Sequence, residues 1–174
     1  ASAVRADVEC PAYREDGEPG PRDRRLTMRD VILARPGLDI IATGHRRFDA
    51  NLELVSGGVD LGPERGWQWV DVAVARGPVR LVNTHLESLS ADIGLAQAHE
   101  LVAAIPRDLA ALVVGDFNSD PLDHVPRGAA AAAPSAAYEA MVGGGYADGW
   151  LASGGIGPGF TAGLSERLDD PTGV

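Results

Sequence analysis

The stretch VRLVNTHLESLSADIGLAQAHELVAAIPRDLAALVVGDFNSDP, residues 79–121, decides the fold because strand, helix and strand patterns follow one another in it. Its first segment, Val79–Leu86, comes after Trp67–Val74, and both alternate apolar and polar residues, as half-buried strands do. Arg76-Gly77-Pro78 between them is typical of a turn. The two segments are therefore predicted to form a β-hairpin.

The rest of the quoted stretch predicts a helix followed by a different kind of strand. Ser90-Ala91-Asp92 can cap a helix over 93–105, whose apolar residues recur at helical spacing, and Pro106 ends it. Leu109–Val114 is a continuous apolar run, which is typical of a strand buried on both faces. Two strands joined by a helix can lie side by side in one sheet with their ends together.

Outside this stretch the patterns are shorter and less regular. They predict a surface loop over 1–28, short strands at 29–35, 39–42 and 51–55, a low-complexity insert at 129–133 and a short helix at 135–142. With the central stretch, these segments indicate a mixed α/β (α+β) fold in which helices cover sheet layers. We expect a single domain over 1–174.

Composition limits the classes of protein to which the chain can belong. With 174 residues, 45% of them hydrophobic and 23% charged, the chain suits one folded domain and differs from disordered proteins. No apolar run approaches the roughly 20 residues that cross a bilayer. The single cysteine, Cys10, excludes an intrachain disulfide and a zinc site built from cysteines. A net charge of −10 argues against tight nonspecific binding to duplex nucleic acid.

Two polar clusters follow predicted strands and are the candidates for chemistry. Asn83-Thr84-His85-Leu86-Glu87 ends the hairpin, and Gly115-Asp116-Phe117-Asn118 follows the apolar run. If the two strands are neighbours, His85, Asp116 and Asn118 meet at one rim of the sheet, where loops build sites. An ionised Asp can orient a water molecule, an Asn amide can stabilise a developing oxyanion, and a His can donate to a phosphate oxygen. A hard cation such as Mg²⁺ would take carboxylate and carbonyl oxygens.

Each candidate also has a plainer interpretation. A histidine near a strand end is often structural or solvated, so spacing alone does not assign a role to His85. Asp116-Phe117-Asn118 fits an ordinary turn as well as a catalytic loop. The other histidines lie in settings that indicate no function; they are His45, His99 and His124.

The two clusters, in this order, resemble the endonuclease/exonuclease/phosphatase family of DNase I-like phosphoesterases. The resemblance rests on Asn83-Thr84-His85-Leu86-Glu87 together with Val113-Val114-Gly115-Asp116-Phe117-Asn118-Ser119-Asp120-Pro121. Other segments are similar to further parts of the family's sequence, so that the resemblance extends over about residues 27–168; they are Arg29–Arg35, Arg65–Val72, Tyr146–Trp150 and Gly159–Thr161.

The resemblance implies a four-layer α/β/β/α sandwich with its site in a cleft at one edge of two packed sheets. It implies a hydrolase of phosphodiester or phosphomonoester bonds that depends on Mg²⁺ or Mn²⁺. Asp116 and Asn118 would orient the attacking water and form a possible second metal site, and His85 would contact the phosphate. Arg65 and Asn83 would bind substrate, although an ordinary surface position suits Arg65 equally.

The sequence departs from the family pattern at both ends. The family has an N-terminal strand with a metal-binding Glu, and Glu9, Glu15 and Glu18 do not follow an apolar strand here. The family's later Asp–His pair is absent from the last residues, 169–174. We therefore expect an incomplete domain whose principal Glu ligand lies outside this chain, with little phosphoesterase activity of its own. Missing strands would also leave sheet edges and core faces open.

Two classes of function remain open at this point. The first is a metal-dependent phosphoesterase whose phosphorylated substrate, a nucleic acid, a lipid or a small molecule, the sequence leaves undecided. The second is a non-catalytic binding module, a pseudoenzyme that keeps the sandwich. The presence of His85, Asp116 and Asn118 together favours the enzyme. Whether the intact protein contains the Glu and the Asp–His pair would discriminate the two classes. The sequence indicates no partner protein.

Overall fold

The structure, a computed structural model, describes residues 6–13, 19–26, 30–56, 59–60, 62–128, 131–157, 159 and 161. The chain divides into two compact units, Ala1–Gly144 and Gly145–Val174, and each is described by itself. The first unit holds the sheet on which the predicted site depends. That 1–174 form a single domain stays a prediction.

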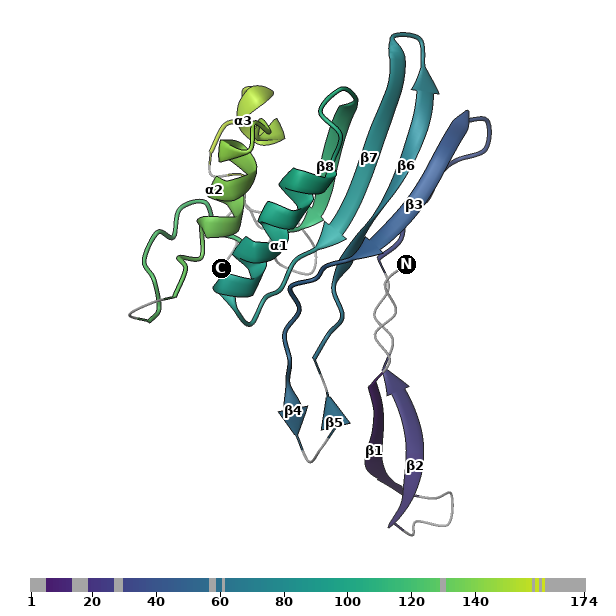
Figure 1. The fold of residues 1–174 in the computed structure, drawn as a ribbon, viewed down its shortest axis with the longest axis vertical. Coiled ribbons are helices and arrows are strands. Elements are labelled where there is room, and N and C mark those ends of the chain that lie inside the picture. The colour runs from purple at the N-terminus through teal and green to yellow at the C-terminus, as the bar shows by residue number, and fades with distance from the viewer. Residues whose placement is uncertain are drawn as a thin grey trace. The chain divides into compact units, whose positions relative to one another are not determined.

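A four-stranded sheet with the order β3-β6-β7-β8 forms the centre of the first unit (Figure 1). Its strands are β3 (Ile40–Arg47), β6 (Gly66–Val74), β7 (Gly77–His85) and β8 (Ala110–Asp116). β6 pairs antiparallel with both β3 and β7, while β7 pairs parallel with β8. The predicted hairpin and the predicted strand–helix–strand unit are thus confirmed, and the fold is of the α+β class.

One helix, α1 (Ala91–Ala104), lies on one face of this sheet, and a second, α2 (Ala136–Gly143), lies beside α1 (Figure 1). α1 connects β7 to β8, and the Ser90 hydroxyl caps it by accepting from the Ile93 N–H at 3.4 Å. α2 packs against α1. Both predicted helices are therefore present. The most deeply buried apolar side chains gather between α1 and the sheet; they include Val82, Leu86, Ala98, Leu101 and Ile105.

On the other face of the sheet, the apolar side chains of the edge strand β8 are exposed, whereas Val70 of β6 is only 7% exposed. Val82 is fully buried on the helix side and lies opposite Val113, so Leu112 and Val114 point to the other side of β8. Their exposed fractions are 60% and 45%. The expectation that this strand is buried on both faces is wrong for the described chain, because the helices cover one face alone. One sheet with helices on one side makes two layers, whereas the resemblance implies a sandwich of four.

Three predictions about the first 60 residues are corrected by the structure. The loop predicted over 1–28 contains β1 (Ala6–Tyr13) and β2 (Pro19–Leu26), which pair antiparallel and so satisfy their backbone groups in a ladder. Within the strand predicted at 29–35, the described residues 30–35 form none, and their apolar side chains Val31 and Leu33 are 56% and 90% exposed.

The strand predicted over 51–55 is also largely absent. β4 (Val55–Ser56) pairs with β5 (Val59–Asp60) and takes in the last predicted residue alone. The physical reason lies in the Asn51 side chain, which accepts from the Arg65 N–H at 2.7 Å and donates to the Phe48 carbonyl at 2.6 Å. Side-chain hydrogen bonds of this kind compete with a sheet ladder.

The second unit contains one short helix, α3 (Gly149–Ala152), among its described residues. The Asp148 carboxylate caps it by accepting from the N–H groups of Trp150 and Leu151. In the described part of the chain, no helix has both the length and the apolar character needed to cross a membrane.

A buried ion pair ties β6 to β7 on the helix side of the sheet. Asp71 and Arg80 are directly opposite each other, and the guanidinium Nε and Nη2 donate to the two carboxylate oxygens at 2.7 and 2.8 Å. This bidentate hydrogen bonding holds the pKa of Asp71 below its ordinary value, although burial acts in the opposite direction. The pair therefore stabilises the folded state in its ionised form.

We predict that Asp71→Asn lowers the free energy of unfolding at pH 7 by about 1.5–3 kcal/mol, because it removes the charge from a bidentate pair. A depressed folded-state pKa adds stability above the ordinary Asp range of about 4, and that stability is lost as the pH falls through the folded pKa. In urea denaturation, the difference between wild type and variant should therefore shrink as the pH falls below about 4 and vanish once the pH is below the folded-state pKa.

The matched control is Asp49→Asn, because Asp49 pairs with Arg46 at 3.7 Å from a side chain that is 84% exposed. Exposed pairs contribute little, so this variant should differ from wild type by less than about 1 kcal/mol. A loss in Asp71→Asn that is equal at all pH values would contradict the account.

Candidate active site

The two predicted polar clusters meet where β7 and β8 end. The parallel register pairs His85 with Asp116 at the last position of each strand, and the Leu86 N–H continues the ladder to the Asp116 carbonyl at 2.9 Å. The His85 Nε2 lies 3.7 Å from the Asp116 Oδ2. Their side chains are 30% and 61% exposed, so both can reach a ligand from solvent. The structure thus brings these two candidates together.

Asn118 joins the same rim through an unusual backbone conformation. Its φ of 45° lies in the left-handed region, which Asn tolerates better than most residues do. Its N–H donates to the Asp116 Oδ1 at 2.9 Å, and its Nδ2 donates to the Leu86 carbonyl at 3.0 Å. Asn118 therefore fastens the loop after β8 to the end of β7, and the turn that the sequence allowed is present at the rim.

Gly115 makes this close approach possible, and sequence patterns did not single it out. Its φ is +134°, and a Cβ at this position would lie 1.8 Å from the Thr84 carbonyl oxygen. No side chain fits there without displacing backbone. The Gly before the Asp of the second cluster was the signal that could have revealed it.

Asn83 and two unpredicted residues extend the polar rim across the sheet. Asn83 lies two residues before His85 and so points to the same face. Gln68 on β6 lies opposite Asn83, and His45 on β3 lies opposite Gln68, so a polar row crosses three strands. The Gln68 Nε2 is buried without a hydrogen-bond partner among the described residues. The pairing register of the three strands brings this row together. Residue spacing along the chain does not reveal that register.

Arg65 lies beneath the rim, where it is 6% exposed. Its Nε is 3.8 Å from the Oε2 of Glu87, a residue that is 2% exposed. The Glu87 N–H donates to the Gln97 Oε1 of α1 at 2.8 Å, which anchors the loop after β7. In this arrangement Arg65 supports the loop from within, and its contact with substrate stays a prediction.

A second cluster contains the residue types of a hydrolytic triad in a geometry that does not suit one. The His124 Nδ1 approaches both the Ser135 Oγ at 3.1 Å and the Glu139 Oε1 at 2.9 Å, so one nitrogen contacts both partners. Ser135 is fully buried and donates to Glu139. Hydrogen bonds from Ser135 and then His124 lower the pKa of Glu139. The cluster holds the start of α2 to the preceding loop.

Two described residues at the rim carry oxygen atoms of the kind that bind divalent cations. Asp116 and Asn118 supply a carboxylate and an amide oxygen at the rim, and both are oxygen donors that Mg²⁺ prefers. Among the residues that the structure describes, no group of three or more His, Cys, Asp or Glu side chains is close enough to hold a metal ion. A complete metal site would need further ligands.

Comparison with known proteins gives one weak structural match. The sequence matches no family model and no curated protein. A solved structure of ANGEL2, described as a 2′,3′-cyclic phosphatase in complex with adenosine-2′,3′-vanadate, matches with 18% identity and a TM-score of 0.33. The match covers 50% of this chain and 27% of ANGEL2.

We predict that Gly115→Ala destabilises the protein by at least about 2 kcal/mol, since it combines backbone strain with a steric clash. Gly77→Ala is the matched control, because Gly77 has a φ of +111° and open space around its Cβ position. It should show the backbone strain alone, roughly 1 kcal/mol. Equal losses for the two variants in urea denaturation would show that the close approach of Gly115 to Thr84 does not exist.

Proposed function

We propose that the protein hydrolyses phosphodiester or phosphomonoester bonds with a divalent metal and that this chain carries part of its active site. The observation that carries the proposal is the convergence of His85, Asp116 and Asn118 at the ends of two parallel strands. The similarity of the two clusters to the endonuclease/exonuclease/phosphatase family supports the same chemistry.

The hydrogen bonds at the rim leave particular atoms available for this reaction. The Asp116 Oδ1 accepts from the Asn118 N–H, so the Oδ2 facing His85 is the oxygen left to orient a water molecule. The Asn118 Nδ2 is engaged by the Leu86 carbonyl, which leaves its side-chain oxygen for a cation or the water. The His85 Nε2 can donate to a phosphate oxygen.

A divalent cation such as Mg²⁺ or Mn²⁺, when bound, would neutralise charge on the phosphate. Asp116 and Asn118 are the residues of this chain proposed to contact it. The described residues hold no group of three or more His, Cys, Asp or Glu side chains that could bind a metal ion. The proposal therefore includes that the Glu implied by the resemblance as principal ligand lies outside them.

The chemistry of the rim indicates a phosphorylated substrate and leaves its class open. A phosphorylated nucleic acid, lipid or small molecule would each present the oxygens that the rim can contact. The net charge of −10 disfavours a nonspecific duplex nuclease, because such enzymes bind the phosphate backbone through a basic surface.

We predict that Asp116→Asn lowers kcat/KM by at least about 100-fold in the full-length protein as its gene encodes it, since the carboxylate can no longer accept a proton from water. The assay measures Mg²⁺-dependent hydrolysis of bis(p-nitrophenyl) phosphate and p-nitrophenyl phosphate, with EDTA as the metal-free control.

Asp120→Asn is the matched control, because Asp120 lies in the same loop and its Oδ1 accepts from the Leu122 N–H, which an Asn can also satisfy. It should retain activity within about twofold. Equal losses in the two variants would overturn the role of Asp116. Binding of a phosphate ester without metal-dependent turnover would overturn the enzyme in favour of a binding module.

A further inference from the structure

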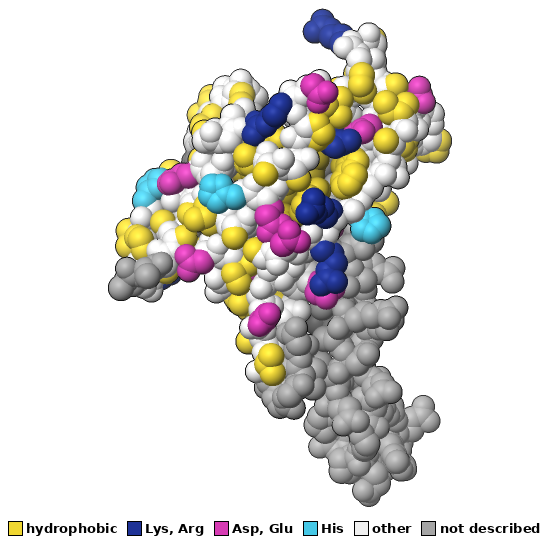
Figure 2. Space-filling view, in the orientation of Figure 1, with side chains coloured by type: hydrophobic (Ala, Val, Ile, Leu, Met, Phe, Trp, Pro, Cys, Tyr) yellow, Lys and Arg dark blue, Asp and Glu magenta, His cyan; other side chains and the backbone are white. Residues whose placement is uncertain are grey.

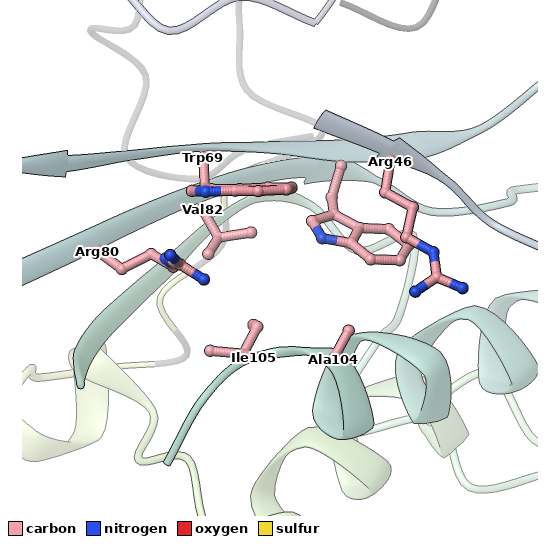
Figure 3. Close-up of a pocket in the computed structure, with 7 residues that line it drawn as sticks. Arg46, Trp69, Arg80, Val82, Ala104 and Ile105 are labelled. Atoms are coloured by element: carbon pink, nitrogen blue, oxygen red, sulfur yellow. The ribbon is translucent and has the colours of Figure 1, made fainter. Parts of the chain in front are cut away.

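A pocket of about 140 Å³ lies between the helix side of the sheet and the C-terminal end of α1 (Figure 3). Val82 of β7 lines the pocket. Val82 and His85 are three positions apart on β7, so their side chains point to opposite faces, and the pocket lies on the opposite face of the sheet from His85. Two tryptophans, two arginines and small apolar side chains line it, chiefly Arg46, Trp67, Trp69, Arg80, Ala104 and Ile105.

The pocket exists because α1 is shorter than the strands beneath it. The 14 residues of α1 extend about 21 Å, whereas the nine residues of β6 or β7 extend about 30 Å. Pro106 follows the end of α1 and cannot continue it. The far parts of β6 and β7 therefore project beyond the helix (Figure 1), and the pocket opens where the helix stops.

Trp69 presents a flat aromatic surface to this space (Figure 3). Its indole lies across Gly44 of β3, where a Cβ would be 2.2 Å from the Trp69 Cζ2. The absence of a side chain at Gly44 is thus what lets the ring lie flat on the sheet. The Arg80 guanidinium lies over this ring, so a planar ring bound in the pocket would lie against the indole beside Arg80. Contact of this kind between a base and an aromatic side chain tolerates many ring types.

The two arginines of the pocket have different roles. The Arg80 guanidinium lies 5.2 Å from the centroid of the Trp69 ring and makes the bidentate pair with Asp71, so its charge is compensated and its position fixed. Arg46 lies 5.7 Å from the centroid of Trp67, and its partner Asp49 is a highly exposed residue 3.7 Å away. Such an exposed pair is weak, so Arg46 can engage another anion.

Figure 2 shows hydrophobic side chains exposed on this face of the molecule, with basic and acidic side chains among them. No carboxylate is among the residues that line the pocket. The lining therefore favours an aromatic ligand with a negative charge over a cationic one.

We propose that this pocket binds a planar aromatic anion of the nucleotide class, with the ring on Trp69 and the phosphate at Arg46. The pocket is smaller than sites for whole drug-sized ligands, which are about 300–1,000 Å³, so it takes the ring alone. The phosphate stays at the opening, where the Arg46 side chain is 59% exposed. This site lies apart from the His85–Asp116 rim and does not depend on the proposed function.

Calorimetric titration of the full chain with adenosine 5′-monophosphate (AMP) tests the proposal. Adenosine supplies the ring without the charge, and ribose 5-phosphate supplies the charge without the ring. We expect saturable binding of AMP, with adenosine about 10-fold weaker and ribose 5-phosphate weaker still, because stacking and a charge-assisted contact act together. If no saturable binding is measured up to about 5 mM AMP, the interaction is very weak at best and the proposal is overturned.

Matched variants place the ligand in this pocket. Arg46→Gln should reduce AMP binding to the level of adenosine, while Arg47→Gln, a change at the neighbouring arginine that pairs with Glu64, should leave it unchanged. Trp69→Ala should weaken binding by about 5- to 150-fold, and Trp69→Phe, which keeps a ring, by less.

Two further variants separate this pocket from other binding surfaces. Trp150→Phe removes an indole of the second unit and should leave AMP affinity unchanged. The titrations contain EDTA, because the rim is proposed to act on phosphomonoesters only with a divalent metal. Under these conditions Asp116→Asn should also leave AMP affinity unchanged, and a loss there would locate AMP at the strand-end rim and overturn the proposed pocket. If Trp69→Ala does not fold, Arg46→Gln and Trp69→Phe still decide the question, since equal AMP affinity in both and in wild type would refute it.

Discussion

The parallel pairing of β7 with β8 is the constraint on which the candidate site depends. It places His85 opposite Asp116, and it continues by one further hydrogen bond from the Leu86 N–H to the Asp116 carbonyl. Gly115 permits this approach, because any larger residue would meet the Thr84 carbonyl. A slip of one residue would turn alternate side chains to the other face and separate the histidine from the carboxylate.

The helix that joins these strands also gives the sheet two different faces. α1 buries Val82 and Leu101 on its own side and leaves Leu112 and Val114 exposed on the other. Because α1 ends at Ala104, the pocket lined by Trp67 and Trp69 stays open beyond it. The rim, the exposed face of β8 and the pocket therefore all follow from one strand–helix–strand unit. The exposed apolar side chains of β8 lie on the face where the sandwich implied by the family resemblance would place a second sheet.

Local patterns predicted the hairpin, both longer helices and the convergence of the two clusters, because alternation, caps and turns are visible within a few residues. Features that depend on distant partners were not predictable in this way. Arg65 is buried because it lies against Glu87, whose loop is anchored to α1. The apolar side chains of β8 are exposed because no described element packs on their side of that strand. The positive φ of Asn118 depends on the Leu86 carbonyl, which lies on another strand's end.

A double-mutant cycle tests most directly whether the two clusters form one catalytic site. The measured quantity is kcat/KM for His85→Ala, Asp116→Ala and the double variant in the full-length protein, with a phosphodiester substrate and Mg²⁺. Residues that act as a unit in one transition state lose activity non-additively, so the double variant should be little worse than the worse single variant. Losses that multiply, or a His85→Ala variant with wild-type activity, would contradict the account.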